Sequence, residues 1–247
     1  MLTPNQTFDQ ENGTQWPVYY DRKHPDGFTI LTSAGNELLH DRDEVAAIRG
    51  LIHRYRAAEI GTLALMGEDK EIRQELGRGQ EAVVYSMGPY AVREAQGISF
   101  FYRAMGELQR MDSINSVIEH GLPRWLNLPK HYALHVDPRL QKTYIMMEKV
   151  NAGTTVEDIM KYPEVAPQKA AAIESGIGEA IVDAQEKVPP LFEQAYEILA
   201  AAIHKSGRDP ARYLTDWNPR NAIVEGRLST PIAGSNYKLS VIDQYRS

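Results

Sequence analysis

Residues Thr215–Val224 read TDWNPRNAIV, and the last strand-like run of the chain, 238–244, reads KLSVIDQ. Asp216 lies five residues before Asn221, in a proline-containing loop that leads into the strand-like run NAIV, and Asp243 ends the later run. A carboxylate can orient or deprotonate an attacking hydroxyl, and amide or carboxylate oxygens bind Mg²⁺, so these three side chains suit phosphoryl transfer. Taken singly, Asp and Asn also favour turns and strand ends.

A glycine pattern upstream could bring backbone N–H groups close to phosphate. The sequence LGRGQEA carries Gly77, Gly79 and Ala82 between two strand-like runs, and glycine has no side chain to obstruct a ligand. A dinucleotide-binding turn would be followed by a helix, whereas VVYSMG reads as the return strand of a hairpin. The alternative is a plain hairpin whose tip contains glycines.

The next strand-like run, YAVREA, supplies a basic side chain. Arg93 lies 14 residues after Gly79, where it could reach phosphate from beneath the loop. Its expected partner is a carboxylate on the following helix. Glu107, near the middle of that helix, is preferred over Glu119, which lies close to the helix end. An arginine with only a surface role is the alternative.

The order of the remaining elements predicts an α+β protein. Three strand-like runs, a helix over 98–111 with a second helical stretch to 119, and the runs HYALHV and TYIMMEKV would form a small α+β lobe. Helices are expected beyond it, over 156–161, 168–187 and 190–205. We therefore divide the chain into an N-terminal extension over 1–68 with an amphipathic helix over 43–58, a lobe over 69–150 and a second lobe over 151–247.

Composition excludes several classes of protein. The 247 residues include no cysteine, which excludes thiol chemistry, and a net charge of −6 argues against a general nucleic-acid binder. No apolar run is long enough to cross a membrane, and the first residues do not resemble a signal peptide. A cytoplasmic location is the expectation.

In their order, the motifs over roughly 71–244 resemble those of the protein-kinase superfamily, including compact bacterial effector kinases, which would be delivered to a host cytosol. The resemblance implies a bilobal kinase-like fold with a β-rich N-lobe and a truncated, mainly helical C-lobe. It implies Asp216 as catalytic base, and Asn221 and Asp243 as Mg²⁺ ligands. It further implies that ATP is bound by the glycine-rich loop, the two following strands and the hinge, through Gly77, Gly79, Ala82, Val84, Ala91, Arg93, Met147, Glu148 and Val150.

The sequence also departs from the kinase pattern. Arg93 stands where kinases carry lysine, Gln244 follows Asp243 where they carry phenylalanine, and the sequence stops four residues after Asp243. The expected activity is phosphoryl transfer from ATP to a protein hydroxyl by a minimal kinase with a protein substrate or partner. A pseudokinase that binds nucleotide or acts as a scaffold, and a small-molecule phosphotransferase, are the alternatives.

Overall fold

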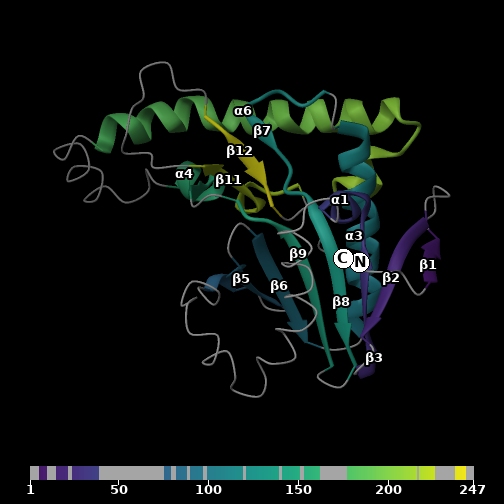
Figure 1. Cartoon of the computed structure of the whole chain (residues 1–247). Helices are drawn as coiled ribbons and strands as arrows, with labels where there is room; N and C mark the ends of the chain where they lie inside the picture. The colour runs from purple at the N-terminus through teal and green to yellow at the C-terminus, as the bar shows by residue number, and fades with distance from the viewer. Residues whose placement is uncertain are drawn as a thin grey trace. The chain divides into compact units, whose positions relative to one another are not determined.

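A computed structural model describes residues 6–9, 15–21, 24–38, 75–78, 82–87, 90–96, 99–118, 121–138, 141–150, 153–161, 177–215, 217–225 and 237–242. These residues form a mixed α and β fold with a large antiparallel sheet and a few helices (Figure 1). The chain divides into two compact units. Unit 1 comprises Met1–Asp112 and Lys130–Lys149, and unit 2 comprises Ser113–Pro129 and Val150–Ser247.

Unit 1 is built on a sheet whose described strands run in the order β1-β2-β3-β8-β9-β6-β5-β4, with every neighbouring pair antiparallel. Met87 of β5 pairs with Tyr90 of β6, so two residues connect these strands, as in a tight hairpin. The bounds are β1 Gln6–Asp9, β2 Gln15–Asp21, β3 His24–Leu31, β4 Glu75–Arg78, β5 Ala82–Met87, β6 Tyr90–Gln96, β8 His131–Asp137 and β9 Lys142–Glu148.

Helix α3, Ser99–Ile118, packs on this sheet (Figure 1). Its buried residues recur three or four positions apart, which gives the helix an apolar face. Ala104, Met105 and Leu108 of α3 join a core cluster with residues of five strands. Those strand residues are Trp16, Val18, Ile30, Ala91, Leu134, Val136, Ile145 and Met147.

The predicted order of three strands, a helix and two strands is confirmed by β4, β5, β6, α3, β8 and β9. Two details differ from the expectation. The two helical stretches are one continuous helix, α3. Residues expected in a separate N-terminal extension also join the sheet of unit 1, because β3 pairs with β8. The short helix α1, Ser33–Leu38, follows β3 directly. The helix expected over 43–58 lies outside the described residues.

Unit 2 contains a smaller sheet with the order β10-β11-β12-β7, in which β12 and β7 are parallel and the other pairs antiparallel. A Cβ atom on Gly153 would lie 1.9 Å from the carbonyl oxygen of Val224, so the approach of β10 to β11 requires glycine there. The bounds are β7 Leu126–Asn127, β10 Gly153–Thr155, β11 Ala222–Glu225, β12 Leu239–Val241, α4 Val156–Lys161, α6 Ile177–Lys205, α7 Pro210–Tyr213 and the 3₁₀ helix η4 Pro219–Asn221.

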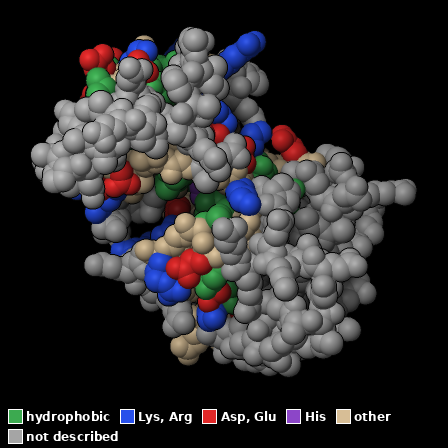
Figure 2. Space-filling model, turned by 90° about the vertical axis from the view of Figure 1, so that its left-hand side faces the viewer, with side chains coloured by type: hydrophobic (Ala, Val, Ile, Leu, Met, Phe, Trp, Pro, Cys, Tyr) green, Lys and Arg blue, Asp and Glu red, His purple; other side chains and the backbone are tan. Residues whose placement is uncertain are grey.

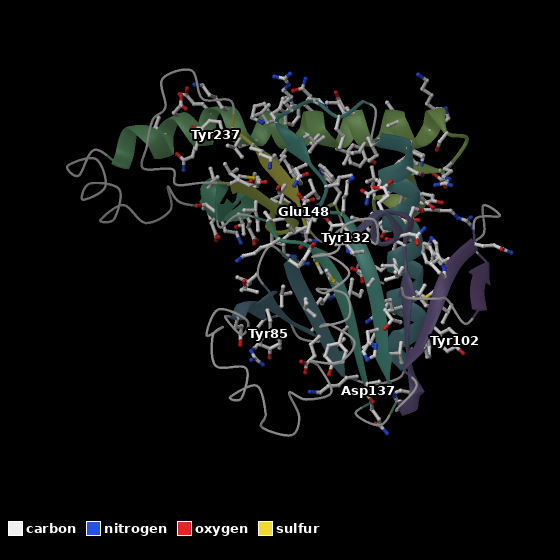
Figure 3. The ribbon with its side chains drawn as sticks, viewed as in Figure 1. Tyr85, Tyr102, Tyr132, Asp137, Glu148 and Tyr237 are labelled. Atoms are coloured by element: carbon white, nitrogen blue, oxygen red, sulfur yellow. The ribbon has the colours of Figure 1, made fainter. Side chains whose placement is uncertain are left out.

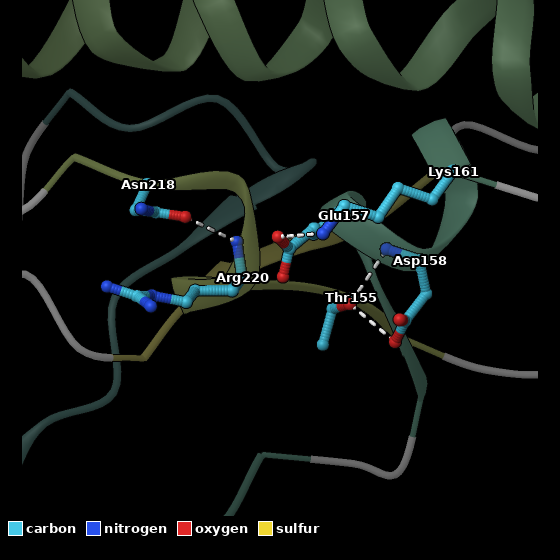
Figure 4. A network of polar contacts seen from close by, with 6 residues as sticks. All are labelled: Thr155, Glu157, Asp158, Lys161, Asn218 and Arg220. Atoms are coloured by element: carbon cyan, nitrogen blue, oxygen red, sulfur yellow. Dashed lines mark hydrogen bonds and ion pairs between the residues drawn. The ribbon is translucent and has the colours of Figure 1, made fainter.

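Side-chain caps fix where the short helices of unit 2 begin (Figure 4). Thr155 Oγ1 accepts a hydrogen bond from the backbone N–H of Asp158 and donates to its carboxylate, and this side-chain cap starts α4 at 156 as predicted. Asn218 Oδ1 accepts from the backbone N–H of Arg220 and starts η4.

Helix α6 corrects the prediction of two helices separated near 188–189. It runs through Pro189 and Pro190, although proline cannot donate a helical hydrogen bond and normally breaks or kinks a helix. Its buried residues continue at spacings of three and four on both sides of the prolines, so packing of this face outweighs the local preference. These residues are Ala184, Val188, Phe192, Ala195, Leu199 and Ile203.

Candidate functional site

The side chains of Arg93 and Glu107 form an ion pair in unit 1. Nη1 of Arg93 donates to both carboxylate oxygens of Glu107, at 2.7 and 2.6 Å. The side chains are 22% and 10% exposed, so the contact is largely shielded from water. The pairing expected from the sequence, with Glu107 as the partner, is therefore confirmed, while its role toward phosphate stays a prediction. Glu119 lies outside the described residues.

Strand parity and helix packing bring the two side chains together. Side chains on a strand alternate between its two faces, so Arg93 shares a face of β6 with Ala91, which is buried in the core cluster beside α3. Glu107 directly precedes Leu108, which is buried in the same cluster. The arginine thus lies at the edge of an apolar contact between β6 and α3, which excludes water and strengthens the ion pair.

A histidine that was not predicted lies next to this pair. Nε2 of His131 is 4.0 Å from Oε1 of Glu107, beyond hydrogen-bonding distance, and the His131 side chain is 2% exposed. His131 begins β8, and its backbone carbonyl accepts a hydrogen bond from Thr32 Oγ1. The sequence HYALHV gave no indication of this neighbour, because the contact depends on how β8 packs against α3.

The glycine pattern lies on the hairpin of β4 and β5. Gly77 pairs with Val84, and the register shifts between Glu75 and Gly77. No described atom lies within 4 Å of a Cβ placed on Gly77, beyond its chain neighbours, and its φ is not positive, so neither packing nor backbone conformation requires glycine there. Gly79 lies outside the described residues. Ala82 and Val84, both partly buried, are on β5.

Two charged residues of this hairpin form an exposed pair. Nε and Nη2 of Arg78 donate to the two carboxylate oxygens of Glu75, at 3.0 and 2.7 Å. The hydrogen bond from Arg78 lowers the pKa of Glu75. Such exposed pairs contribute little stability. On the surface drawn in Figure 2, described Lys, Arg, Asp and Glu side chains of both signs lie side by side.

The segment expected to form the ATP-binding hinge is the end of β9 with the residues that follow it. Met147 is buried and pairs with Ala91, and both belong to the core cluster. The backbone N–H of Glu148 donates to the carbonyl of Lys130 at 2.7 Å, so this donor is already used within unit 1. Glu148 and Tyr132 lie at one end of the sheet and Asp137 at the other (Figure 3). Val150, partly buried, follows β9.

Lys149 was not singled out from the sequence. Its Nζ donates to Oγ of Ser86 at 2.7 Å, and Ser86 is buried on β5. The bond ties the segment after β9 to β5, the strand next to the edge strand β4. A lysine and a serine 63 residues apart carry no local pattern that would have predicted it.

In unit 2, the loop that contains Asn221 is held next to the end of β12. The backbone N–H of Asn221 donates to the carbonyl of Asn218, and the carbonyl of Asn221 accepts from the backbone N–H of Ile242, both at 2.8 Å. Asn221 is buried. Asp243 is the next residue after Ile242 in sequence. Asp216 and Asp243 themselves lie outside the described residues, so their roles stay predictions.

An aromatic stack supports the same loop. The ring of Trp217 lies 4.6 Å from that of Phe192 at an interplanar angle of 18°, and 5.4 Å from Tyr196 at 61°. Phe192 and Tyr196 are four residues apart on α6 and therefore share one side of that helix. The stack anchors the residue that directly follows Asp216.

Within the described ranges, no three His, Asp or Glu side chains gather as a metal site would require. In the same ranges, no helix is both long and apolar enough to cross a membrane. No known family model matches the chain, and comparison with curated proteins finds no relative.

Proposed function

We propose that the chain is an ATP-dependent phosphotransferase of the protein-kinase-like type, with a bilobal fold whose N-lobe lies in unit 1 and whose C-lobe lies in unit 2. The observation that carries the proposal is the ion pair between Arg93 on β6, the strand after the glycine-bearing hairpin of β4 and β5, and Glu107 on α3, the helix that follows. The expected ion pair is present among the described residues. The strand order β4-β5-β6-β9-β8, with α3 packed on this sheet, supports the same interpretation.

The donor chemistry fits Mg·ATP. Asn221 offers an amide oxygen and Asp243 a carboxylate, and Mg²⁺ prefers oxygen ligands. The bond between Ile242 and Asn221 holds the backbone of these two segments together. When bound, Mg·ATP supplies the phosphoryl group that is transferred and cations that balance its charge.

The protein side chains then have separate tasks. Arg93 would bind phosphate oxygens while Glu107 fixes the position of its guanidinium group. Gly77 would let the backbone of the hairpin approach the phosphates. Asp216 would orient the acceptor hydroxyl and accept its proton. We propose a protein hydroxyl as the acceptor.

Labelled ATP tests this function. Purified protein is incubated with γ-labelled ATP, Mg²⁺ and a cell lysate, beside Asp216→Asn. We expect label in protein with the wild type and a loss of about 10²- to 10⁴-fold in the variant, the usual contribution of a catalytic base. As a matched control, Asp209→Asn changes an exposed carboxylate that caps α7, where its Oδ1 accepts from Ala211. This variant should retain the wild-type rate.

The other outcomes identify the alternatives. Label in small molecules would indicate a small-molecule phosphotransferase. Nucleotide-induced thermal stabilisation without any transfer would indicate a pseudokinase. If the protein shows no phosphate transfer and no thermal stabilisation by nucleotide, it does not bind nucleotide, and the proposal is contradicted.

A further inference from the structure

Asp112 of α3 is bonded to two elements of the N-terminal segment. Nε1 of Trp16, on β2, donates to Oδ2 of Asp112 at 3.0 Å, and Oγ of Ser33, at the start of α1, donates to the same oxygen at 3.0 Å. Asp112 is 6% exposed and Trp16 1% exposed. All three residues belong to unit 1.

These bonds fix the helix at that point. A buried carboxylate is stable only where donors satisfy its oxygens, and bonds to an ionised acceptor are stronger than those between neutral groups. Two donors from separate elements converge on one oxygen, so Asp112 cannot move along or around the helix axis without breaking at least one bond. The position of α3 thus depends on β2 and α1.

The fixed point is close to Glu107. Asp112 lies five positions after Glu107, which corresponds to about 7.5 Å along an α-helix and about 140° around it. The helix is therefore tied to β6 on one side, through Arg93, and to β2 and α1 on another. The ring of Trp16 belongs to the same core cluster as Ala104, Met105 and Leu108, which surround Glu107 in the sequence.

We infer that β2 and α1 form a built-in clamp, the N-terminal clamp, that holds α3 where Glu107 pairs with Arg93. Trp16, Ser33 and Asp112 are its positioning residues. The clamp gives the first strands of the chain a functional task beyond extending the sheet. Its effect on catalysis rests on the proposed phosphotransferase function, whereas its effect on the helix does not.

The first test measures the helix directly. Hydrogen exchange is followed by mass spectrometry over peptides that cover 101–111, in the full chain with the double substitution Trp16→Phe, Ser33→Ala. We expect exchange in this part of α3 to accelerate on the order of tenfold, because the hydrogen bonds from Trp16 and Ser33 to Asp112 are lost. Ser33→Ala alone removes one donor and leaves the buried indole in place, so it should accelerate exchange less. This single variant tests the clamp if the double variant does not fold.

Val18→Ala is the matched control. Val18 lies on β2 and in the same core cluster, but it is a hydrophobic residue with no donor for Asp112. Under conditions in which Val18→Ala and the clamp variants have equal free energies of unfolding, Val18→Ala should leave the rate of exchange over 101–111 close to that of the wild type. Equal acceleration in this control and in the clamp variants would overturn the clamp and leave only general core packing.

The second test links the clamp to the ion pair by a double-mutant cycle in kcat/KM. Trp16→Phe, Ser33→Ala should lower kcat/KM on the order of tenfold in the wild-type background and leave it nearly unchanged in Glu107→Gln, because connected residues are not additive. Equal losses in both backgrounds would overturn the link. If the wild type neither transfers phosphate nor binds nucleotide, the proposed function fails, while the exchange measurement still decides whether the clamp exists.

Discussion

Arg93 contacts Glu107 through a single nitrogen. Nη1 donates to both carboxylate oxygens, at 2.7 and 2.6 Å, instead of the parallel two-nitrogen arrangement that arginine often forms with a carboxylate. A single nitrogen between two oxygens is a contact that a lysine ammonium can also make. Arginine and lysine can therefore make the same contact with Glu107 at this position.

Arg93→Lys should accordingly retain kcat/KM for ATP within about tenfold, because the charge and the single-nitrogen contact are kept. Arg93→Met keeps a long side chain without the charge. Its kcat/KM for ATP should fall more than about tenfold, which corresponds to the loss of a hydrogen bond to a charged group. Steady-state kinetics of the two variants provide the measurement. Abolition of activity by lysine would show that the guanidinium has a task of its own.

Gly77→Ala separates a role in function from a role in folding. Since a Cβ atom on Gly77 would meet open space, the free energy of unfolding should change by no more than about 0.5 kcal/mol. A phosphate close to the backbone would meet the methyl group, so kcat/KM should fall on the order of tenfold. Denaturant unfolding and ATP kinetics are compared on the same preparation. A fully active variant would argue for a plain hairpin.

Gly153→Ala should destabilise unit 2 by about 2–3 kcal/mol, because the added Cβ would lie 1.9 Å from the carbonyl oxygen of Val224 and the two strands would have to separate. Gly106 is the matched position. A Cβ there meets nothing within 4 Å among the described atoms, and the residue lies inside α3. Gly106→Ala should therefore raise the free energy of unfolding by about 0.5–1 kcal/mol. Denaturant titration should show a lower free energy of unfolding for Gly153→Ala and a higher one for Gly106→Ala.

Asp183 should make the stability of unit 2 dependent on acid pH. Its pKa is lowered, first by the hydrogen bond from Lys187 and then by that from the hydroxyl of Tyr237. A carboxyl group with a lowered pKa in the folded state stabilises the fold above its ordinary pKa, and this contribution is lost as the pH falls through the folded value. Below about pH 4, the wild type should therefore lose stability more steeply than Asp183→Asn.

Denaturant unfolding at pH 7 and pH 3 provides the comparison, with Glu186→Gln on the same helix as an exposed control. Parallel pH dependence in the wild type and Asp183→Asn would contradict the assignment. The same hydrogen bond acts on Tyr237 in the opposite direction. Burial, followed by the bond to Asp183, raises its pKa, so its hydroxyl stays protonated and bonded as the pH rises past the ordinary tyrosine range.

The spacing of apolar residues within short segments predicted individual strands and helices of unit 1. The alternation of YAVREA and the helical spacing after it are properties of short segments, and together they predicted that Arg93 would meet Glu107. Contacts between distant segments left no such signal. Trp16 and Asp112 are 96 residues apart, and the pairing of β3 with β8 joins segments about a hundred residues apart.

Helix α6 is a case in which tertiary packing outweighs a local sequence preference. Separate helices were expected over 168–187 and 190–205, but α6 runs through Pro189 and Pro190, and its buried residues on both sides of them continue one apolar face. The candidate site also combines contacts that local pattern predicts with contacts that it does not. Arg93 and Glu107 could be paired from strand and helix positions, whereas His131 and Lys149 reach their neighbours only through tertiary packing.

We propose that this chain transfers phosphate and that Glu107 acts in the transfer through Arg93. The rate of phosphate transfer from labelled ATP is measured for the wild type, Glu107→Gln, Arg93→Met and the double variant. We expect each single variant to lose about 10- to 100-fold and the double variant to lose little more, because both substitutions break the same ion pair. Activity that survives both substitutions, or losses that multiply in the double variant, would show that the ion pair between Arg93 and Glu107 has no such role.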